Sequence, residues 1–427
     1  MNNVKIKKAT GIRGTIQLPG DKSISHRSIM LSSIAEGRTT IKNFLMAEDC
    51  VSTMDAFRAM GVNIYREGKD IVVEGKGLRG LKCPEKDLYL GNSGTTMRVI
   101  LGILSGQDFK VTLTGDESLS KRPMKRVITP ITMMGAHVSS TEGHAPLTIT
   151  GGSPEAITYQ SPVASAQVKS AILLAGLYCG GTTHVTEPSK SRDHTERMLK
   201  GFGAKVRTDG LRVSIEGSAL KSPGGIFIPS DISSAAFFMV AAAILKDSKI
   251  TLKDVGVNPT RTGIIDILRG MGASVSVGKK KEDMYEPMAD ITVESSGLRG
   301  IEIKGEMIPR CIDELPAVMA AAAFAKGVTT IKGASELRVK ETDRIESMVT
   351  GLEKMGALID VRGDDIAITG GGKLKGAVLD SFGDHRTAMS LAVAGLAAEG
   401  ETVIQNTDCI ATSFPEFREI LDGLIFV

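Results

Sequence analysis

The sequence predicts an α/β protein of two similar domains, each built from three copies of a strand–helix–strand unit. Three observations predict this fold class. A unit with one order of apolar and polar segments recurs six times, a longer segment recurs at an offset of 210 residues, and a length of 427 residues favours two domains over one. Hydrophobic residues make up 42% of the chain and charged residues 24%, which is typical of a soluble globular protein.

The short unit begins with a strand-like run of Thr, Val and Ile. It continues through a polar segment into a stretch with apolar residues at helical spacing. It closes on a glycine, and a glycine just after a helix predicts a left-handed cap, because glycine adopts that conformation without steric penalty. The copies cover residues 38–64, 110–138, 181–206, 249–275, 327–359 and 401–427. Their closing glycines are Gly61, Gly135, Gly203, Gly272, Gly356 and Gly423.

Between these copies lie stretches that are apolar on nearly every helical face. Examples are VASAQVKSAILLAG (163–176) and IDELPAVMAAAAFAKG (312–327). A helix without a polar face is stable only where all of its faces are covered. We therefore expect these helices to be buried in the domain interiors.

The longer repeat relates residues 16–35 to residues 226–245, and it predicts two chain crossings, near 19–21 and 229–231. One domain would then combine residues 1–20 with 230–427, and the other would comprise residues 21–229. Pro19, Asp21 and Ser23 match Pro229, Asp231 and Ser233, whereas Lys22, His26 and Arg27 of LPGDKSISHRS match Ile232, Ala236 and Phe237. Cations that occur in one copy alone indicate a task specific to that place.

Composition excludes several classes of protein. The net charge is +3 and Trp is absent, which argues against a nucleic-acid binder with a basic, aromatic surface. No apolar run reaches about 18 residues, so we expect no spanning helix, and MNNVKIKKATG has no apolar core or cleavage site, so we do not expect it to be a signal peptide. Five scattered cysteines without a C-x-x-C pair are typical of reduced thiols. We expect a cytoplasmic monomer that binds neither nucleic acid nor membrane.

Three stretches have residues suited to binding anions. GNSGTTMR (91–98) is a Gly-rich turn before a helix, which suits a phosphate or carboxylate, although an ordinary capped helix start explains it equally well. LSKRPMKR (119–126) is most simply a solvated basic face. In VASAQVKS (163–170), capping accounts for Ser165 but not for both Gln167 and Lys169.

Three further stretches combine cations with carboxylates. ELRVKETDRIES (336–347) is explained either by intrahelical ion pairs or by a binding site. FGDHRTAM (382–389) places a charged triplet before an apolar helix, which favours a functional role. Asp313 in CIDELP is either a general base or a helix cap.

Other familiar catalytic sites are missing from the sequence. It contains no G-x-x-x-x-G-K-[ST] loop, no H-E-x-x-H motif and no G-x-S-x-G turn. The histidines and cysteines are not clustered as zinc ligands would be. What remains is a pocket rich in Arg and Lys with one or two carboxylates, suited to holding two anionic small molecules.

Ten motifs together resemble one enzyme family over nearly the whole chain. In order they are LPGDKSISHRS, LGNSGTTMR, LSKRPM, ASAQVKSA, SRDHTERM, NPTRTG, IDELP, LRVKETDRI, DHRTAM and TSFPEF. They are similar to those of 5-enolpyruvylshikimate-3-phosphate synthase, in its bacterial branch. The resemblance implies transfer of the enolpyruvyl group of phosphoenolpyruvate to the 5-hydroxyl of shikimate 3-phosphate, with release of phosphate. It also implies the shikimate pathway to chorismate and aromatic amino acids, no metal or organic cofactor, and an inside-out barrel-like fold of two domains with three βαβαββ units each.

The resemblance also assigns roles to residues. For catalysis it implies Asp313 as the proton acceptor near the 5-hydroxyl, Glu341 as the acid–base partner near the methylene carbon, and Lys22. For shikimate 3-phosphate it implies Lys22, Ser23, Arg27, Ser165, Gln167, Arg192, Asp313 and Lys340. For phosphoenolpyruvate it implies Lys22, Gly94, Arg98, Arg122, Gln167, Arg344, His385 and Arg386.

The chain departs from the family pattern at a few positions. Thr412 stands where many members have Lys, so one cation near phosphoenolpyruvate is missing or replaced. Gly94 is kept where the best-known members tolerant of the herbicide glyphosate carry Ala. The related transferase acting on UDP-N-acetylglucosamine is a rival, but residues 110–126 lack its reactive cysteine. A non-catalytic anion-binding scaffold is a second rival, and it predicts loss of Asp313 and Glu341, which are both present.

Overall fold

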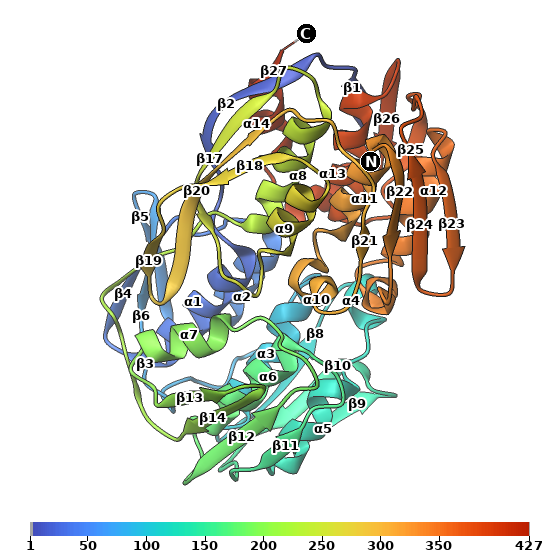
Figure 1. The fold of residues 1–427 in the computed structure, drawn as a ribbon. Coiled ribbons are helices and arrows are strands. Elements are labelled where there is room, and N and C mark those ends of the chain that lie inside the picture. Colours follow the sequence, from blue (N-terminus) through green and yellow to red (C-terminus); the bar gives the residue numbers. More distant parts are fainter. Residues whose placement is uncertain (1–2, 427) are drawn as a thin grey trace. The chain divides into compact units, whose positions relative to one another are not determined.

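The computed structural model describes residues 3–426, and the chain forms two compact units (Figure 1). Unit 1 comprises the described residues up to Pro19, Ser230–Lys281 and those from Pro287 onward. Unit 2 comprises Gly20–Pro229 together with Glu282–Glu286. The chain therefore leaves unit 1 after Pro19 and returns at Ser230.

Each crossing is fixed by a backbone hydrogen bond. At the first crossing the Asp21 N–H donates to the Pro229 carbonyl at 2.8 Å, and at the second the Asp231 N–H donates to the Pro19 carbonyl at 3.1 Å. Both aspartates then cap a helix, with Asp21 accepting from the Ile24 N–H and Asp231 from the Ser233 N–H. A carboxylate that satisfies free N–H groups at a helix start stabilises that start.

Unit 2 contains three four-stranded sheets with one shared strand order. In each sheet two neighbouring strands run parallel, and an antiparallel hairpin completes the order. The first is β16 (Gly225–Phe227), β4 (Arg38–Lys42), β6 (Asp70–Glu74) and β5 (Asn63–Glu67). The second is β7 (Leu88–Tyr89), β8 (Lys110–Thr114), β10 (His144–Thr150) and β9 (His137–Thr141). The third is β11 (Thr158–Gln160), β12 (Thr182–Thr186), β14 (Arg212–Glu216) and β13 (Val206–Asp209).

Unit 1 repeats this order but uses both chain ends to complete it. One sheet is β21 (Glu302–Ile303), β22 (Gly327–Ile331), β24 (Asp365–Gly370) and β23 (Leu358–Arg362). A second has the order β18 (Ser274–Val277), β20 (Glu286–Glu294), β17 (Lys249–Gly256), β2 (Gly11–Gln17) and β27 (Ile425–Phe426). The third is β1 (Val4–Lys7), β26 (Glu401–Gln405) and β25 (Val378–Asp380).

The six-fold strand–helix–strand unit predicted from the sequence is confirmed. In each copy the first strand leads to one helix of a set of six and then to a second strand. The helices are α2 (Glu48–Ala59), α5 (Lys125–Met133), α7 (His194–Gly201), α9 (Gly263–Gly270), α12 (Arg344–Lys354) and α14 (Phe417–Leu424).

A second set of helices forms the interior of each unit. In unit 1, α8 (Ile232–Ile244), α11 (Leu315–Phe324) and α13 (His385–Ala397) pack on one another, and they meet β17, β24 and β26 respectively. Figure 1 shows these helices side by side with strands around them. In unit 2, α1 (Lys22–Ile34), α3 (Gly94–Leu104) and α6 (Ala166–Gly176) meet β6, β10 and β12. The predicted burial of the apolar helices is confirmed for α6 and α11.

The closing glycines agree with the prediction with one exception. Five of them, from Gly61 to Gly356, have φ between 84° and 101°, so they occupy the left-handed cap after their helix. Gly423 lies inside α14 without a positive φ, so the prediction is wrong there. The reason is that α14 runs on to Leu424 and passes directly into β27, which leaves no turn for a glycine to make.

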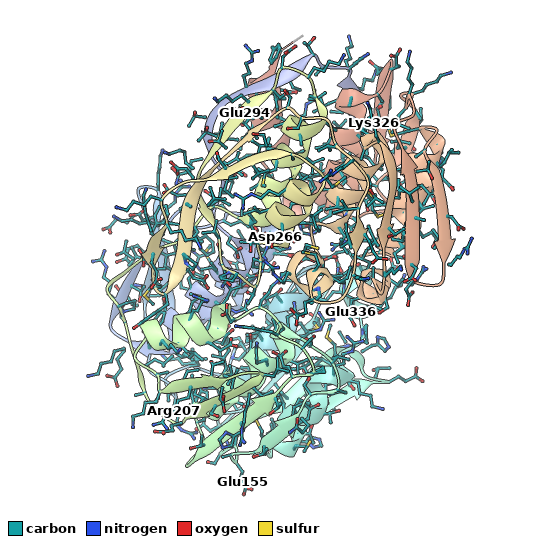
Figure 2. All side chains as sticks on the ribbon, in the orientation of Figure 1. Glu155, Arg207, Asp266, Glu294, Lys326 and Glu336 are labelled. Carbon is teal, nitrogen blue, oxygen red and sulfur yellow. The ribbon has the colours of Figure 1, made fainter. Side chains whose placement is uncertain are left out.

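Charged side chains populate the outside of both units. Figure 2 labels Glu155 and Arg207 of unit 2 and Lys326 of unit 1, and all three are exposed. Searching residues 3–426 finds no helix with the length and apolar character needed to cross a membrane.

Candidate active site

The first candidate residues of unit 2 lie at the start of α1. Lys22 is the first residue of this helix, and its Nζ donates to Oδ2 of Asp49 at 2.9 Å. The two side chains are 16% and 10% exposed. Asp49 belongs to the first turn of α2, and the sequence reasoning missed it. The sequence shows Asp49 only as an acidic residue at a helix start. The helix dipole stabilises acidic residues there in any helix, so this position alone does not indicate a functional role.

His26 and Arg27 point into unit 2 rather than to solvent. The His26 ring is fully buried, and its Nδ1 lies 2.6 Å from Oγ1 of Thr53. Burial, and then the charges of Lys22 and Arg27, lower the pKa of His26 well below its ordinary value. His26 is thus a neutral packing residue in the middle of the cationic stretch.

Arg27 connects three segments that carry candidate residues for shikimate 3-phosphate. Its guanidinium donates to the carbonyl of Ser23 at 2.9 Å, to Oγ of Ser170 on α6 at 2.8 Å, and to Oγ1 of Thr195 on α7 at 2.7 Å. Burial lowers the pKa of Arg27 to about 10, and the charge of Arg192 adds to that lowering. Arg27 remains a cation at neutral pH, and the structure brings Ser23, Arg27 and Arg192 together.

A second group of candidates meets at the start of α3. Ser93 caps this helix by accepting from the Thr96 N–H, and Gly94 is its first residue. The Arg98 guanidinium donates to Oε1 of Gln167 at 2.9 Å, which ties α3 to α6. A Cβ built on Gly94 would lie 2.9 Å from Nη1 of Arg98 and 3.1 Å from Nη1 of Arg122. Two guanidinium groups therefore converge on this glycine.

The basic residues of the run LSKRPMKR differ in their exposure to solvent. Arg122 is buried and donates to the Asn92 carbonyl at 3.3 Å and to the Asn92 side chain. Lys121 and Lys125 are exposed, and Lys121 pairs with Glu117 at the surface. The solvated-face interpretation therefore holds for the lysines and is wrong for Arg122, which lines the Gly94 turn.

In unit 1 one buried arginine holds both candidate acid–base residues. Arg344, which is 1% exposed, donates from Nη1 to Oδ1 of Asp313 at 3.3 Å and from Nη2 to Oε2 of Glu341 at 2.5 Å. Its Nε donates to Oδ2 of Asp384 at 2.8 Å. Burial alone would lower the pKa of Arg344, but the three carboxylates outweigh burial and raise it above the ordinary value. Arg344 is therefore a permanent cation.

Two more cations surround Asp313. Nζ of Lys340 lies 3.7 Å from its Oδ1, and Arg386 donates to its backbone carbonyl at 3.0 Å. The interpretation of Asp313 as a helix cap is wrong, because α11 begins at Leu315 and Glu314 is its N-cap residue. The Asp313 and Glu341 carboxylates are 15% and 18% exposed, so both keep access to solvent or ligand.

The stretch ELRVKETDRIES is not one continuous helix. A 3₁₀ turn ends at Val339, and α12 starts only at Arg344, capped by Asp343. Intrahelical ion pairs therefore do not explain this stretch. The break leaves Lys340 and Glu341 in an irregular segment beside Asp313, where loop geometry rather than helical spacing positions them.

In the charged triplet 384–386, Asp384 has a structural role, whereas His385 and Arg386 are candidate functional residues. Asp384 is fully buried, caps α13 through the N–H groups of Arg386 and Thr387, and orients Arg344. The sequence reasoning missed this second role. Nδ1 of His385 lies 3.2 Å from Oγ1 of Thr412, so a hydroxyl against an imidazole stands where many family members have lysine.

The TSFPEF segment that carries Thr412 is fixed by aromatic packing. Phe414 and Phe417 are almost fully buried, with ring centroids 5.8 Å apart in an edge-on arrangement. Phe414 also meets Phe238 of α8 at 6.1 Å. Aromatic pairs at these distances add to the stability gained from burial, so Thr412 has a defined place in unit 1.

In the second copy of the long repeat, the matched residues contact a cation that lies outside the repeat. Arg261 of NPTRTG donates from Nη2 to Oγ of Ser233 at 2.6 Å and lies 3.5 Å from both Asp231 and Glu314. All four side chains are buried. The sequence comparison, which used the matched positions alone, did not find this cluster.

Comparison with known proteins defines first the class and then the family. The structure is similar to the enolpyruvyl transferase NikO from Streptomyces tendae, with a TM-score of 0.81, 19% identity and 98% and 96% of the two chains covered. That likeness shows the fold, which is the two-domain α/β fold of enolpyruvyl transferases. It is also similar to an EPSP synthase from Acinetobacter baumannii, with a TM-score of 0.89, 47% identity and 99% and 98% coverage.

The sequence relatives are closer still. The 3-phosphoshikimate 1-carboxyvinyltransferase of Citrifermentans bemidjiense is 52% identical over 427 residues, covering 100% of both chains. The enzyme of the same name from Geobacter sulfurreducens is 53% identical, covering 97% of both chains. The model of the family EPSP synthase (3-phosphoshikimate 1-carboxyvinyltransferase) matches residues 6–421. The chain belongs to the EPSP synthase family, which confirms the resemblance found in its motifs.

Proposed function

We propose that this chain carries out the reaction of its family with the residues described above. It transfers the enolpyruvyl group of phosphoenolpyruvate to the 5-hydroxyl of shikimate 3-phosphate and releases phosphate. The observation that carries the residue assignment is the contact of Arg344 with both Asp313 and Glu341. Two partly exposed carboxylates beside fixed cations suit a reaction that removes one proton and supplies another between anionic substrates.

Asp313 acts as the base in this proposal. The 5-hydroxyl of shikimate 3-phosphate loses its proton to the Asp313 carboxylate as its oxygen attacks C2 of phosphoenolpyruvate. The methylene carbon is protonated in the same addition, which gives a tetrahedral intermediate. Glu341 gives its proton to the methylene carbon in this addition and takes a proton back from the resulting methyl group in the elimination, because it is the second carboxyl group that Arg344 orients. The intermediate then loses phosphate and a methyl proton, which re-forms the carbon–carbon double bond and gives the enol ether of the product.

The cations neutralise charge on the two substrates. Lys22 starts α1 and is oriented by Asp49, so an ammonium and a helix N-terminus act at one place. We assign the binding of shikimate 3-phosphate to Lys22, Ser23, Arg27, Ser165, Gln167, Arg192, Asp313 and Lys340.

Phosphoenolpyruvate uses a partly separate set of residues. Its carboxylate and phosphate suit the planar fork of arginine, which binds such groups through two hydrogen bonds at once. We assign the binding of phosphoenolpyruvate to Lys22, Gly94, Arg98, Arg122, Gln167, Arg344, His385 and Arg386.

We also propose that the enzyme is a cytoplasmic monomer that works without a metal or organic cofactor and binds neither nucleic acid nor membrane. The small net charge supports the absence of nucleic acid, and the Arg- and Lys-rich candidate sites support binding of anionic substrates without a metal. Retention of full activity after treatment with EDTA and gel filtration would support the cofactor part, and a mass measured by light scattering tests the monomer.

The deciding experiment is phosphate release from purified protein mixed with phosphoenolpyruvate and an acceptor. We expect release with shikimate 3-phosphate and none with UDP-N-acetylglucosamine. Release with the sugar nucleotide instead would assign the chain to the other transferase activity. Tight binding of shikimate 3-phosphate without any turnover would favour a non-catalytic scaffold.

A further inference from the structure

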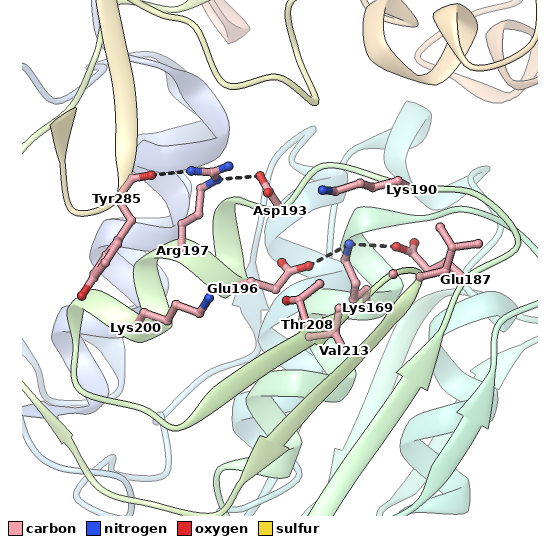
Figure 3. A pocket seen from close by; sticks show the side chains of 12 residues that line it. Lys169, Glu187, Lys190, Asp193, Glu196, Arg197, Lys200, Thr208, Val213 and Tyr285 are labelled. Atoms are coloured by element: carbon pink, nitrogen blue, oxygen red, sulfur yellow. Dashed lines mark hydrogen bonds and ion pairs between the residues drawn. The ribbon is translucent and has the colours of Figure 1, made fainter. Parts of the chain in front are cut away.

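Lys169 is buried inside unit 2 and paired with two carboxylates. Its Nζ lies 2.8 Å from Oε2 of Glu187 and 2.8 Å from Oε1 of Glu196. The three side chains are 2%, 2% and 5% exposed. Figure 3 shows Lys169 between the two glutamates at the floor of a pocket whose wall includes Lys190, Asp193 and Arg197. Helix capping leaves this lysine unexplained.

The lysine is charged. Burial on its own would lower the pKa of Lys169, but the nearby carboxylates of Glu196 and Glu187 outweigh burial and raise it. Burial raises the pKa of Glu196, and Lys169 opposes that rise. Lys169 thus supplies a buried positive charge that compensates a carboxylate taken out of water, which would otherwise be costly.

Glu187, the other carboxylate paired with Lys169, holds two separate segments. Its Oε1 accepts from the backbone N–H of Ser165 at 3.1 Å. Its Oε2 accepts from Oγ of Ser191 at 2.9 Å and from the Ser191 N–H at 3.4 Å. Ser165 caps α6 two residues before Gln167, and Ser191 directly precedes Arg192. One carboxylate therefore fixes two of the three segments that carry unit 2 candidates for binding shikimate 3-phosphate, the third being the start of α1.

The sheet topology explains why these segments meet. β11 and β12 are parallel neighbours, so their carboxyl ends lie at the same edge of the sheet. Residues 161–165 come after β11, and Glu187 comes directly after β12. The Ser161 N–H donates to the Thr186 carbonyl at 2.8 Å, which keeps the two exits together. A carboxylate at this point reaches both loops without crossing the sheet.

We propose that Glu187, charge-compensated by Lys169, is a positioning residue for shikimate 3-phosphate, setting the spacing of Ser165 and Gln167 relative to Arg192. The proposal rests on the proposed function, because it takes these residues as substrate contacts. Glu187 itself faces the two loops and Lys169.

The test is Glu187→Gln in the full-length protein. Glutamine keeps the size and one acceptor oxygen, but its NH₂ group would face the Ser191 donors and Lys169 in place of an acceptor. We expect the Kd for shikimate 3-phosphate, measured by calorimetry without phosphoenolpyruvate, to rise about tenfold or more, since hydrogen bonds to charged groups are among the strong ones. KM for phosphoenolpyruvate should rise less than the Kd for shikimate 3-phosphate, because Gln167 alone of the residues assigned to phosphoenolpyruvate lies in a segment that Glu187 holds.

Glu196→Gln is the matched control. It removes the other carboxylate that pairs with Lys169, and the two glutamates are similarly buried. Among the described contacts of Glu196, none is a hydrogen bond from its side chain to the loop of Ser165 or of Ser191. We expect a lower Tm and an unchanged Kd for shikimate 3-phosphate. If Glu187 had only a structural role, Glu187→Gln would also lower Tm and leave the Kd for shikimate 3-phosphate unchanged. That result would overturn the proposal.

Ser191→Ala gives an answer even if Glu187→Gln fails to fold. It removes one hydroxyl that donates to Glu187 and keeps the Lys169 pair, so Kd should rise about threefold. An unchanged Kd in Ser191→Ala, with normal binding by wild type, would overturn this proposal alone. Failure of wild type to bind shikimate 3-phosphate would overturn the proposed function and this inference with it.

Discussion

Arg344 donates a hydrogen bond of 3.3 Å from Nη1 to Oδ1 of Asp313 within unit 1. The contact places the candidate base against a buried cation that three carboxylates keep in its charged form. Arg344 also contacts Glu341, so one side chain sets the positions of both groups that would exchange protons. Substitution of Arg344 would disturb both, whereas substitution of either carboxylate isolates one step.

Replacing Asp313 with alanine tests the base. We expect kcat to fall by roughly 10²–10⁴, the range for loss of a positioned acid or base, with Kd for shikimate 3-phosphate largely kept. Steady-state kinetics and calorimetry check both values. Asp360→Ala, the same change at an exposed position of unit 1, is the control and should leave kcat unchanged. Near wild-type turnover in Asp313→Ala would refute the assignment.

Replacing Gly94 with alanine tests convergence of the guanidinium groups on this turn. The new Cβ would lie 2.9 Å from Nη1 of Arg98, so Arg98 and Arg122 must shift. We expect KM for phosphoenolpyruvate to rise about tenfold or more, since a misplaced contact of about 1 Å is costly. KM for shikimate 3-phosphate should change much less. In Gly152→Ala, where a Cβ meets nothing within 4 Å, both constants should stay at wild-type values.

Two other glycines should respond in opposite directions to the same substitution. A Cβ on Gly423 or on Gly135 meets nothing within 4 Å, so crowding does not distinguish them. Gly423 lies within α14, where alanine is favoured by about 0.5–1 kcal/mol. Gly135 has φ 101°, which strains any other residue. Chemical denaturation should therefore show Gly423→Ala stabilised and Gly135→Ala destabilised, and equal effects would contradict the backbone argument.

His26 should make the protein less stable as the pH falls. Its pKa in the folded protein is well below 6.5, because burial and the charges of Lys22 and Arg27 disfavour the imidazolium, while Asp21 favours it weakly. Below about pH 6.5 the unfolded chain therefore binds the proton more readily, and the free energy of unfolding falls by up to about 1.4 kcal/mol per pH unit.

His26→Asn checks this link, because its amide can still reach Thr53 but does not titrate. Urea unfolding between pH 5 and 8 should show a flatter pH profile for this variant than for wild type. His137→Asn, at an exposed position, is the control and should keep the wild-type slope. An unchanged slope in His26→Asn would show that other groups set the acid sensitivity.

The sequence predicted the parts of the fold that depend on periodicity. Repeated strand–helix spacing predicted the six copies, and uniform apolarity predicted buried α6 and α11, because these patterns arise from burial alone. It failed at Gly423, because a cap depends on the element that comes after the helix. Here that element is β27, whose formation depends on pairing with the distant β2.

The site was harder to predict for a similar reason. Motifs indicated Lys22, Asp313 and Arg344, whose residue types suit anions and proton transfer. Asp49 and Glu187 were missed, and so was the contact of Asp384 with Arg344, because a carboxylate that holds a cation or a loop looks in sequence like a helix cap or surface charge. Their roles come from contacts between residues up to 40 positions apart, which no local pattern encodes.

The pairing of both chain ends within unit 1 bears on the order in which the protein folds during its synthesis. β2 pairs with β17 and β27, and β1 pairs with β26, so residues 4–17 emerge from the ribosome long before their partner strands. Every strand of the three unit 2 sheets has been made once residue 227 is added, and the remainder takes on the order of 10–40 s at bacterial rates. We expect a nascent chain stalled near residue 300 to resist protease across residues 20–229 while residues 4–7 are still cleaved, because β26, the partner strand of β1, has not yet been made. Residues 4–17 therefore lack one or more of their partner strands during most of translation. The sheets of unit 1 are completed only after β26 and β27 have been made.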